Sequence, residues 1–148
     1  MEPNEIFNTE RDAPDSRPEA DKGDTMNHNQ FVRLPAERTS GGDYEAIVNH
    51  HLINFAVPSK SGQVGKTIVT LARGPQNRNT VGAKCDLDTL ALKISHLTPV
   101  RVYGTGEGKD IGPGLVNLSR VVEITEYEKF VNLTFVDGEE LNVTNRLV

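Results

Sequence analysis

The stretch FVNLTFVDGEELNV, residues 130–143, decides the fold of this chain. Apolar and polar residues alternate on both sides of Asp137-Gly138, and an Asp-Gly pair in such a setting is a strong signal for a tight β-hairpin. Alternation with a period of two places one set of side chains on one face of a sheet. The sequence therefore predicts an antiparallel hairpin here, with Gly138 at positive φ.

Short β-branched stretches precede this hairpin, separated by turn residues such as Gly, Pro, Asn and Ser. Residues 104–114 are rich in glycine and predict a long loop. The fold class that follows is mostly β (α+β): a small antiparallel, barrel-like β-meander of about seven strands with one short helix. No internal repeat is evident. We expect strands at residues 47–48 with 52–57, 67–72, 80–85, 100–103, 115–118, 120–124, 130–135 and 141–143.

One segment has helical periodicity. Asp86 is a suitable N-cap, and Pro99 ends the helix because a residue before proline avoids helical backbone angles. Spacing of three, four and three residues predicts an apolar helix face. That face consists of Leu87, Leu90, Ile94 and Leu97, with Leu92 widening it.

The N-terminal part has a different composition. Residues 1–25 carry eight acidic and three basic side chains, a net charge of −5, so residues 26–148 are neutral in sum. The acidic segment cannot bury enough apolar surface to offset its conformational entropy. We therefore expect a disordered acidic tail over 1–42, dispensable for folding, and a single β-rich domain over 43–148.

The sequence also indicates the compartment. The single cysteine, Cys85, cannot form an intramolecular disulfide and lies in an alternating stretch that favours a buried thiol. No stretch reaches the roughly 18 consecutive apolar residues of a membrane span, and no apolar signal-peptide core is present. We expect a cytoplasmic protein without membrane attachment.

Catalytic and metal motifs are not found. Gly65-Lys66-Thr67 lacks the first glycine of a phosphate loop and leads into a strand pattern. Adjacent residues on a strand point to opposite faces, so His50 and His51 are not expected to bind one metal ion. We predict neither an enzyme nor a metal or other cofactor.

Residues 86–148 resemble the LytTR DNA-binding domain of bacterial regulators. The helix at 86–94 stands where that family has a leucine-rich helix, and residues 99–105, PVRVYGT, stand at its basic strand. Val116-Asn117 matches its V-N stretch, and residues 133–146 match its closing D-G hairpin. The strand pattern is also similar to small flagellar regulators of the FlbD type.

The resemblance implies a domain that contacts duplex DNA through loops, with Arg101, Thr105 and Arg146 at the matched positions. The sequence departs from the family where Tyr103, Gly104 and Thr105 replace its histidine, arginine and serine, and where a glycine insertion at 106–114 follows. Its closing arginine is also displaced by one place. A one-place shift on a strand reverses the face of a side chain. Charge and loop position add Arg73, Arg78 and Lys109 as further candidates.

Two functions follow as hypotheses. The first is a LytTR-like protein that binds double-stranded DNA and regulates transcription. The second is a non-enzymatic β module, an accessory protein of phage or plasmid origin, that binds a protein partner through an exposed strand edge.

Overall fold

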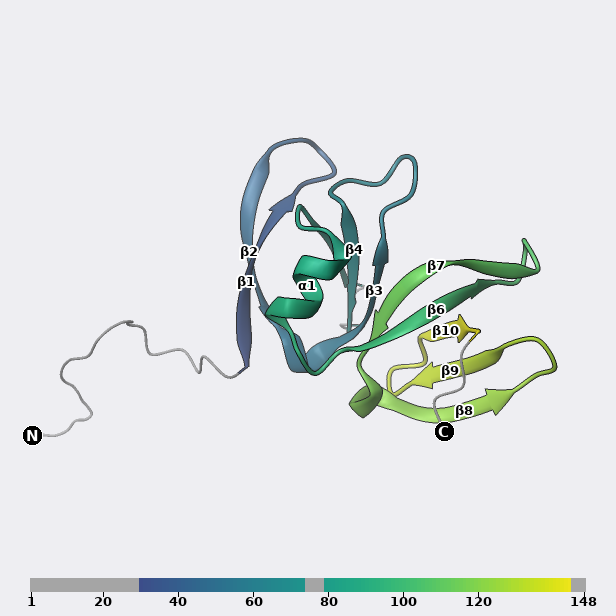
Figure 1. The fold of residues 1–148 in the computed structure, drawn as a ribbon. Coiled ribbons are helices and arrows are strands. Elements are labelled where there is room, and N and C mark those ends of the chain that lie inside the picture. The colour runs from purple at the N-terminus through teal and green to yellow at the C-terminus, as the bar shows by residue number, and fades with distance from the viewer. Residues whose placement is uncertain (1–29, 74–78, 145–148) are drawn as a thin grey trace, which may run out of the picture. The chain divides into compact units, whose positions relative to one another are not determined.

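The structure is a computed structural model that describes residues 30–73 and 79–144. These residues form ten strands, one α-helix and two 3-10 helices (Figure 1). The helices are η2 His50–Leu52, α1 Leu87–Lys93 and η3 Leu118–Arg120. The strands are β1 Phe31–Glu37, β2 Asp43–Asn49, β3 Ile53–Pro58, β4 Thr67–Leu71, β5 Asn79–Ala83, β6 Thr98–Gly104, β7 Lys109–Val116, β8 Val121–Glu126, β9 Val131–Phe135 and β10 Glu140–Val143.

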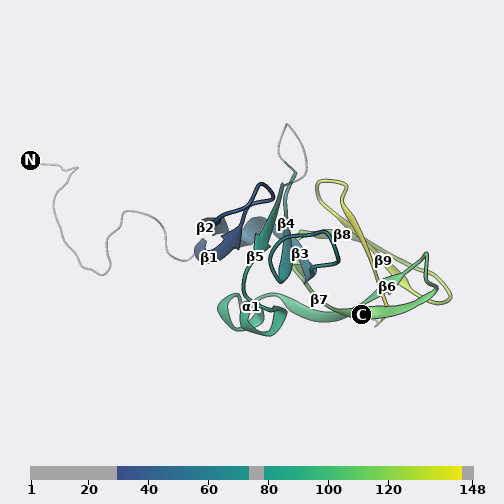
Figure 2. The ribbon, with the colours of Figure 1, turned by 90° about the horizontal axis from the view of Figure 1, so that it is seen from above.

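The ten strands form one antiparallel sheet with the order β2-β1-β5-β4-β3-β7-β6-β10-β9-β8. The last five strands are arranged in the sheet in the same relative order as the first five, so β6 to β10 correspond in turn to β1 to β5. We call β1–β5 the first half and β6–β10 the second half; α1 lies between them in the chain. Both ribbon views show the halves as separate parts of the sheet (Figure 1, Figure 2). The fold is therefore a structural repeat, contrary to the sequence-based expectation.

Backbone hydrogen bonds recur at corresponding positions of the two halves. In each half, the residue just after the fifth strand donates a backbone hydrogen bond to a residue of the first strand. The residue just after the fourth strand donates one to the last residue of the 3-10 helix. In the first half, these bonds run from Lys84 N–H to Pro35 C=O (2.8 Å) and from Ala72 N–H to Leu52 C=O (2.7 Å). In the second half, they run from Thr144 N–H to Arg101 C=O (2.8 Å) and from Val136 N–H to Arg120 C=O (2.8 Å).

The two 3-10 helices also correspond. The side chain of Asn49 accepts a hydrogen bond from the His51 N–H, and the side chain of Asn117 accepts one from the Ser119 N–H. Each 3-10 helix leads into a strand whose pairing shifts register near its start. These matches fix which residue of one half corresponds to which residue of the other.

The halves meet where β3 pairs with β7, a contact that we call the joint. Phe55 lies opposite Val116, and Ala56 lies opposite Leu115. Phe55 belongs to the core of the second half, whereas Ala56 and Leu115 belong to the core of the first. Neighbouring strand residues point to opposite faces. The two cores therefore lie on opposite faces of the sheet at the joint.

Each half has its own hydrophobic core, and α1 covers the first one (Figure 1). The helix contributes Leu90, and the residues after it contribute Ile94 and Leu97. The second core is built from strands alone, and the rings of Phe55 and Phe135 meet there with centroids 5.6 Å apart.

The predicted N-cap of α1 is confirmed, because an Asp86 carboxylate oxygen accepts a hydrogen bond from the Thr89 N–H at 2.9 Å. The helix ends at Lys93, six residues before Pro99, so the proline does not end it. Leu92 is 85% exposed and does not belong to the buried face. In the part of the chain that the structure describes, no helix is long and apolar enough to cross a membrane.

The sheet begins earlier than the sequence predicts. The expected tail runs to residue 42, yet β1 occupies Phe31–Glu37, and its Leu34 and Ala36 side chains are completely buried. Most of the tail's other residues lie outside the described part of the chain. The sheet is open, with β2 and β8 at its two ends, rather than barrel-like.

The glycine-rich segment at 104–114 is mostly strand, not loop, because β7 starts at Lys109. A Cβ on Gly114 would meet a Val102 methyl at 2.8 Å, so close side-chain packing requires glycine there. The hairpin that opened the sequence analysis is confirmed: β9 pairs with β10, and Gly138 has a φ of 91°.

Candidate functional site

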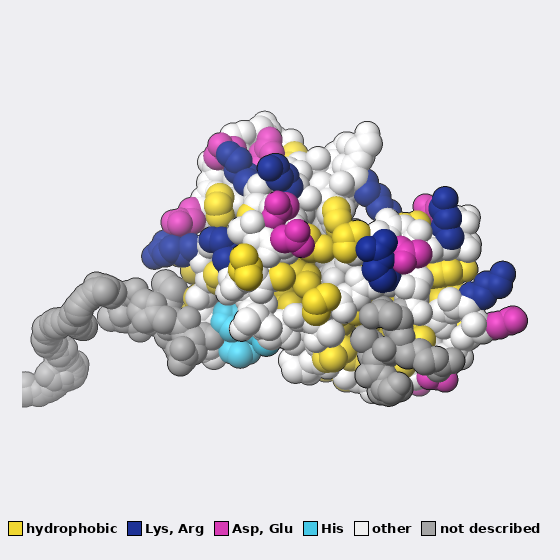
Figure 3. Space-filling model, viewed as in Figure 1, with side chains coloured by type: hydrophobic (Ala, Val, Ile, Leu, Met, Phe, Trp, Pro, Cys, Tyr) yellow, Lys and Arg dark blue, Asp and Glu magenta, His cyan; other side chains and the backbone are white. Residues whose placement is uncertain are grey.

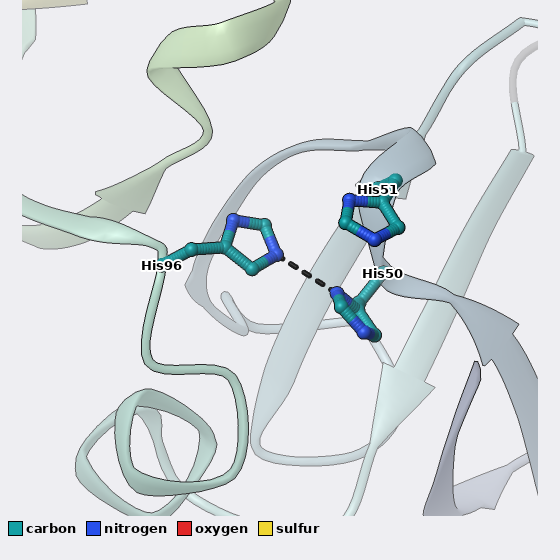
Figure 4. Close-up of side chains that lie close together, drawn as sticks. All are labelled: His50, His51 and His96. Atoms are coloured by element: carbon teal, nitrogen blue, oxygen red, sulfur yellow. Dashed lines mark hydrogen bonds between the residues drawn. The ribbon is translucent and has the colours of Figure 1, made fainter. Parts of the chain in front are cut away.

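Three histidines lie together where the first half meets the segment that follows α1. The Nδ1 of His50 is 2.9 Å from the Nε2 of His96, and the three rings point toward one another (Figure 4). One ligand nitrogen from each of His50, His51 and His96 lies within 4.8 Å of the other two. The rings of His51 and His96 stack with centroids 5.7 Å apart.

The chain brings these side chains together through η2. His50 and His51 lie on a 3-10 helix and not on a strand, so they do not point to opposite faces as the sequence predicts. The Asn49 side chain caps η2, and the Asn117 side-chain amide donates to the His51 carbonyl at 3.3 Å. His96 follows α1 and lies between the buried Ile94 and Leu97.

The environment favours a neutral imidazole at His96. Burial lowers the pKa of His96, and the nearby His50 and His51 lower it further by charge repulsion. A neutral imidazole keeps one unprotonated nitrogen, which can accept a hydrogen bond or bind a metal ion.

The joint carries a hydrogen-bond network across the two halves. Asn54 is completely buried; its amide nitrogen donates to both Asp137 carboxylate oxygens (3.3 and 3.2 Å), and its carbonyl accepts from Arg120 Nε at 2.7 Å. The backbone N–H of Arg73 donates to Asp137 at 2.7 Å. The guanidinium of Arg73 forms an ion pair with Glu139 at 2.9 Å. Although burial opposes it, the hydrogen bonds from Arg73, Glu139 and Asn54 hold the pKa of Asp137 below its usual range.

The predicted DNA contacts are divided between places. Arg101 lies on β6 and forms a bidentate pair with Asp110 (2.9 and 3.1 Å), which raises the pKa of the guanidinium. Thr105 and Lys109 are exposed on the same β6–β7 hairpin. Arg73 follows β4 instead and contacts Asp137 and Glu139 in the network that links the two halves. Arg78 and Arg146 lie outside the described residues.

Charges are mixed on the face drawn in Figure 3, where Lys and Arg side chains lie among Asp and Glu side chains. A hollow of about 640 Å³ opens beside the β1–β2 hairpin. Two of its charged side chains are engaged: Arg38 lies 4.5 Å from the Tyr44 ring centre, and a Glu37 carboxylate oxygen accepts from the Gly65 N–H. Neither feature singles out a ligand.

The two ends of the sheet expose apolar side chains. Ile47 on β2 is 45% exposed, and Val122 on β8 is 64% exposed. Leu52, at the end of η2 beside β3, is 43% exposed. Neither β2 nor β8 contains lysine or proline, residues that often protect edge strands from pairing.

Local sequence patterns predicted neither the histidine cluster nor the repeat. The shared Asn49 and Asn117 caps were one available signal, since each precedes a short segment and an apolar strand. The other was the similarity of TIVTLARG at 67–74 to VNLTFVDG at 131–138. In comparisons with known proteins, no protein-family model, no curated protein and no solved structure matches this chain.

Proposed function

We propose that this protein is a cytoplasmic, non-enzymatic β module that binds a second copy of itself head to tail, with β8 of one copy pairing with β2 of the next. The joint is the observation that supports this proposal. Within the chain, β3 is the last strand of the first half in the order of the sheet. It pairs with β7, which is the first strand of the second half in that order. The corresponding strands are β8 and β2, and these are the two ends of the sheet.

Corresponding positions support the same pairing. In the joint, Arg120 donates to Asn54. Leu52 is the last residue of η2, and Arg120 is the last residue of η3. Val122 is the second residue of β8, and Asn54 is the second residue of β3. The polar pair of Arg120 and Asn54 inside the chain therefore corresponds to Leu52 and Val122. These are two exposed apolar side chains that would meet when a second copy binds.

Ile47 gives a third match. It precedes the Asn49 cap by two residues, as Leu115 precedes the Asn117 cap. Leu115 is only 2% exposed because it packs into the core of the first half, across the joint, whereas Ile47 is exposed at the end of the sheet. Pairing with β8 of a second copy would cover Ile47 in the same way, opposite Ile124.

The charges on β2 do not oppose this contact. Asp43 pairs with Lys84 at 2.6 Å, and Glu45 pairs with Arg33 at 3.0 Å, so both acids of β2 are balanced locally. On β8, Glu123 corresponds to Phe55 by its pairing register. A carboxylate at that position keeps the contact weak and reversible, since pairing would partly desolvate it.

The contact is heterologous, because two different edges meet. Such contacts produce rings when the rotation between copies closes, and filaments when it does not. Sedimentation equilibrium between about 10 μM and 1 mM is suited to the micromolar to millimolar affinity of a short edge contact. We expect the average mass of the wild-type protein to rise above that of the monomer across this range.

Two single substitutions test the geometry. Val122→Lys blocks β8, and Ile47→Lys blocks β2, so each variant alone is expected to stay monomeric. An equimolar mixture retains one intact β8 and one intact β2, and should form dimers but nothing larger. Leu92→Lys, on the exposed face of α1, is the control and should associate like the wild type. Glu123→Phe should strengthen association by about tenfold or more.

Three results would contradict the proposal. A wild-type protein that remains monomeric up to about 1 mM has no useful edge contact. Dimers of Val122→Lys alone would indicate a different contact, because that variant has no intact β8. Association of both lysine variants at the wild-type level would place the interface elsewhere.

Duplex DNA is the alternative partner, implied by the LytTR resemblance. Its support is that Arg101, Thr105 and Lys109 share one exposed hairpin. Arg101 would have to exchange Asp110 for a phosphate or a base. If DNA binds, log K should fall linearly with log salt, and the double change Arg101→Ala, Arg146→Ala should weaken binding about tenfold at an unchanged Tm. Absence of binding to random duplex at low salt would exclude this alternative.

A further inference from the structure

The histidine cluster has the composition of a transition-metal site. Imidazole nitrogens suit zinc and its neighbours in the first transition series, and three protein ligands with an open fourth position are a common zinc arrangement. His50, His51 and His96 supply three nitrogens from two segments that are 46 residues apart, measured from His50 to His96.

The distances are compatible with one ion. Zinc lies about 2.0–2.1 Å from each imidazole nitrogen, so the nitrogens of a tetrahedral site are about 3.3 Å apart. The three nitrogens here lie within 4.8 Å of one another, and the His50–His96 pair is already at 2.9 Å. Small rotations of side chains that are exposed or half-buried bring all three into range (Figure 4).

The backbone around the cluster is held in place before any ion binds. Asn49 and Asn117 fix η2 from two sides through hydrogen bonds to the backbone of His51. The buried side chains of Ile94 and Leu97 anchor the segment that carries His96. A fixed backbone lowers the ordering cost of binding, so the side chains alone need to adjust.

We propose that His50, His51 and His96 bind one zinc ion, with water in the fourth position. The ion would tie η2 of the first half to the segment that connects the two halves. This placement would make the ion a cross-link between two segments of the chain. The proposal is independent of self-association and of DNA binding.

The full-length protein, stripped with EDTA, is titrated with ZnCl₂ by calorimetry and with CoCl₂ by visible absorption. One ion per chain is expected, and cobalt should give the d–d bands of a four-coordinate site. Zinc at a hundredfold excess over its Kd should raise Tm by about 5 °C or more, because an ion that binds only the folded state stabilises it.

Each of His50→Gln, His51→Gln and His96→Gln should weaken zinc binding by about tenfold or more, since each removes one ligand. His28→Gln changes the only other histidine in the chain and is the matched control, with wild-type affinity expected. Tm values of the stripped variants, measured first, separate a lost ligand from a misfolded protein.

The proposal fails if wild-type protein binds no zinc at about 100 μM, a concentration well above the Kd of a structural site. It also fails if a correctly folded His96→Gln variant binds zinc as the wild type does. Equal loss in His28→Gln would show that the ion is bound by another set of histidines.

Discussion

A chain that starts at residue 38 is expected to lose cooperative folding, whereas a chain that starts at residue 30 retains it. The two differ only by β1 and the residue before it. β1 lies between β2 and β5 in the sheet, and its Leu34 and Ala36 are completely buried. Its removal exposes the first core and leaves β2 without its neighbour.

The size of this effect follows from burial. Leu34 alone contributes about 2–3 kcal/mol by leaving water. The loss of Ala36 and of two rows of strand hydrogen bonds adds to this, against a total stability of about 5–15 kcal/mol for a typical domain. Thermal unfolding followed by circular dichroism is the measurement. A Tm for residues 38–148 within about 2 °C of that for residues 30–148 would show that β1 is not needed.

Leu90→Ala is expected to reduce the free energy of unfolding by about 2–5 kcal/mol, the usual cost of truncating a buried leucine. Leu90 is completely buried and is the α1 residue that enters the first core. Part of the loss is the transfer of the side chain to water, and the rest is the cavity left between the helix and the sheet.

Leu92→Ala is the matched control for this change. It removes the same atoms from the same helix, but Leu92 is 85% exposed, so the stability should change by less than about 0.5 kcal/mol. Urea titrations of the two variants and the wild type give the comparison. Equal losses in the two variants would mean that α1 does not pack on the sheet through Leu90.

Local patterns were sufficient to predict part of the fold. The Asp137-Gly138 hairpin and the Asp86 N-cap depend on a few neighbouring residues, and both are present. The mostly β class was predictable for the same reason. Strand β1 was not predicted, because it contains Pro35, and the start of β7 was not predicted, because it contains Gly112 and Gly114; both residue types typically interrupt strands.

The candidate sites depend on contacts that local patterns do not contain. His96 meets His50 and His51 only through the path of the chain after α1. The strand preference around His50 was overridden by the Asn49 cap, which turns the backbone into a 3-10 helix. The repeat was hidden because its two halves share backbone hydrogen bonds but few side chains: buried Asn54 corresponds to exposed Val122.

The connection through α1 has a consequence for the strength of the joint. Two strand edges on one chain meet at an effective concentration of the order of millimolar when the linker is short. Because of this, β3 and β7 can stay paired through a contact that would be weak between separate molecules. β8 and β2 have no such tether. Their pairing would depend on how closely copies are crowded together, which would make local protein density, rather than a chemical signal, the quantity to which this module responds.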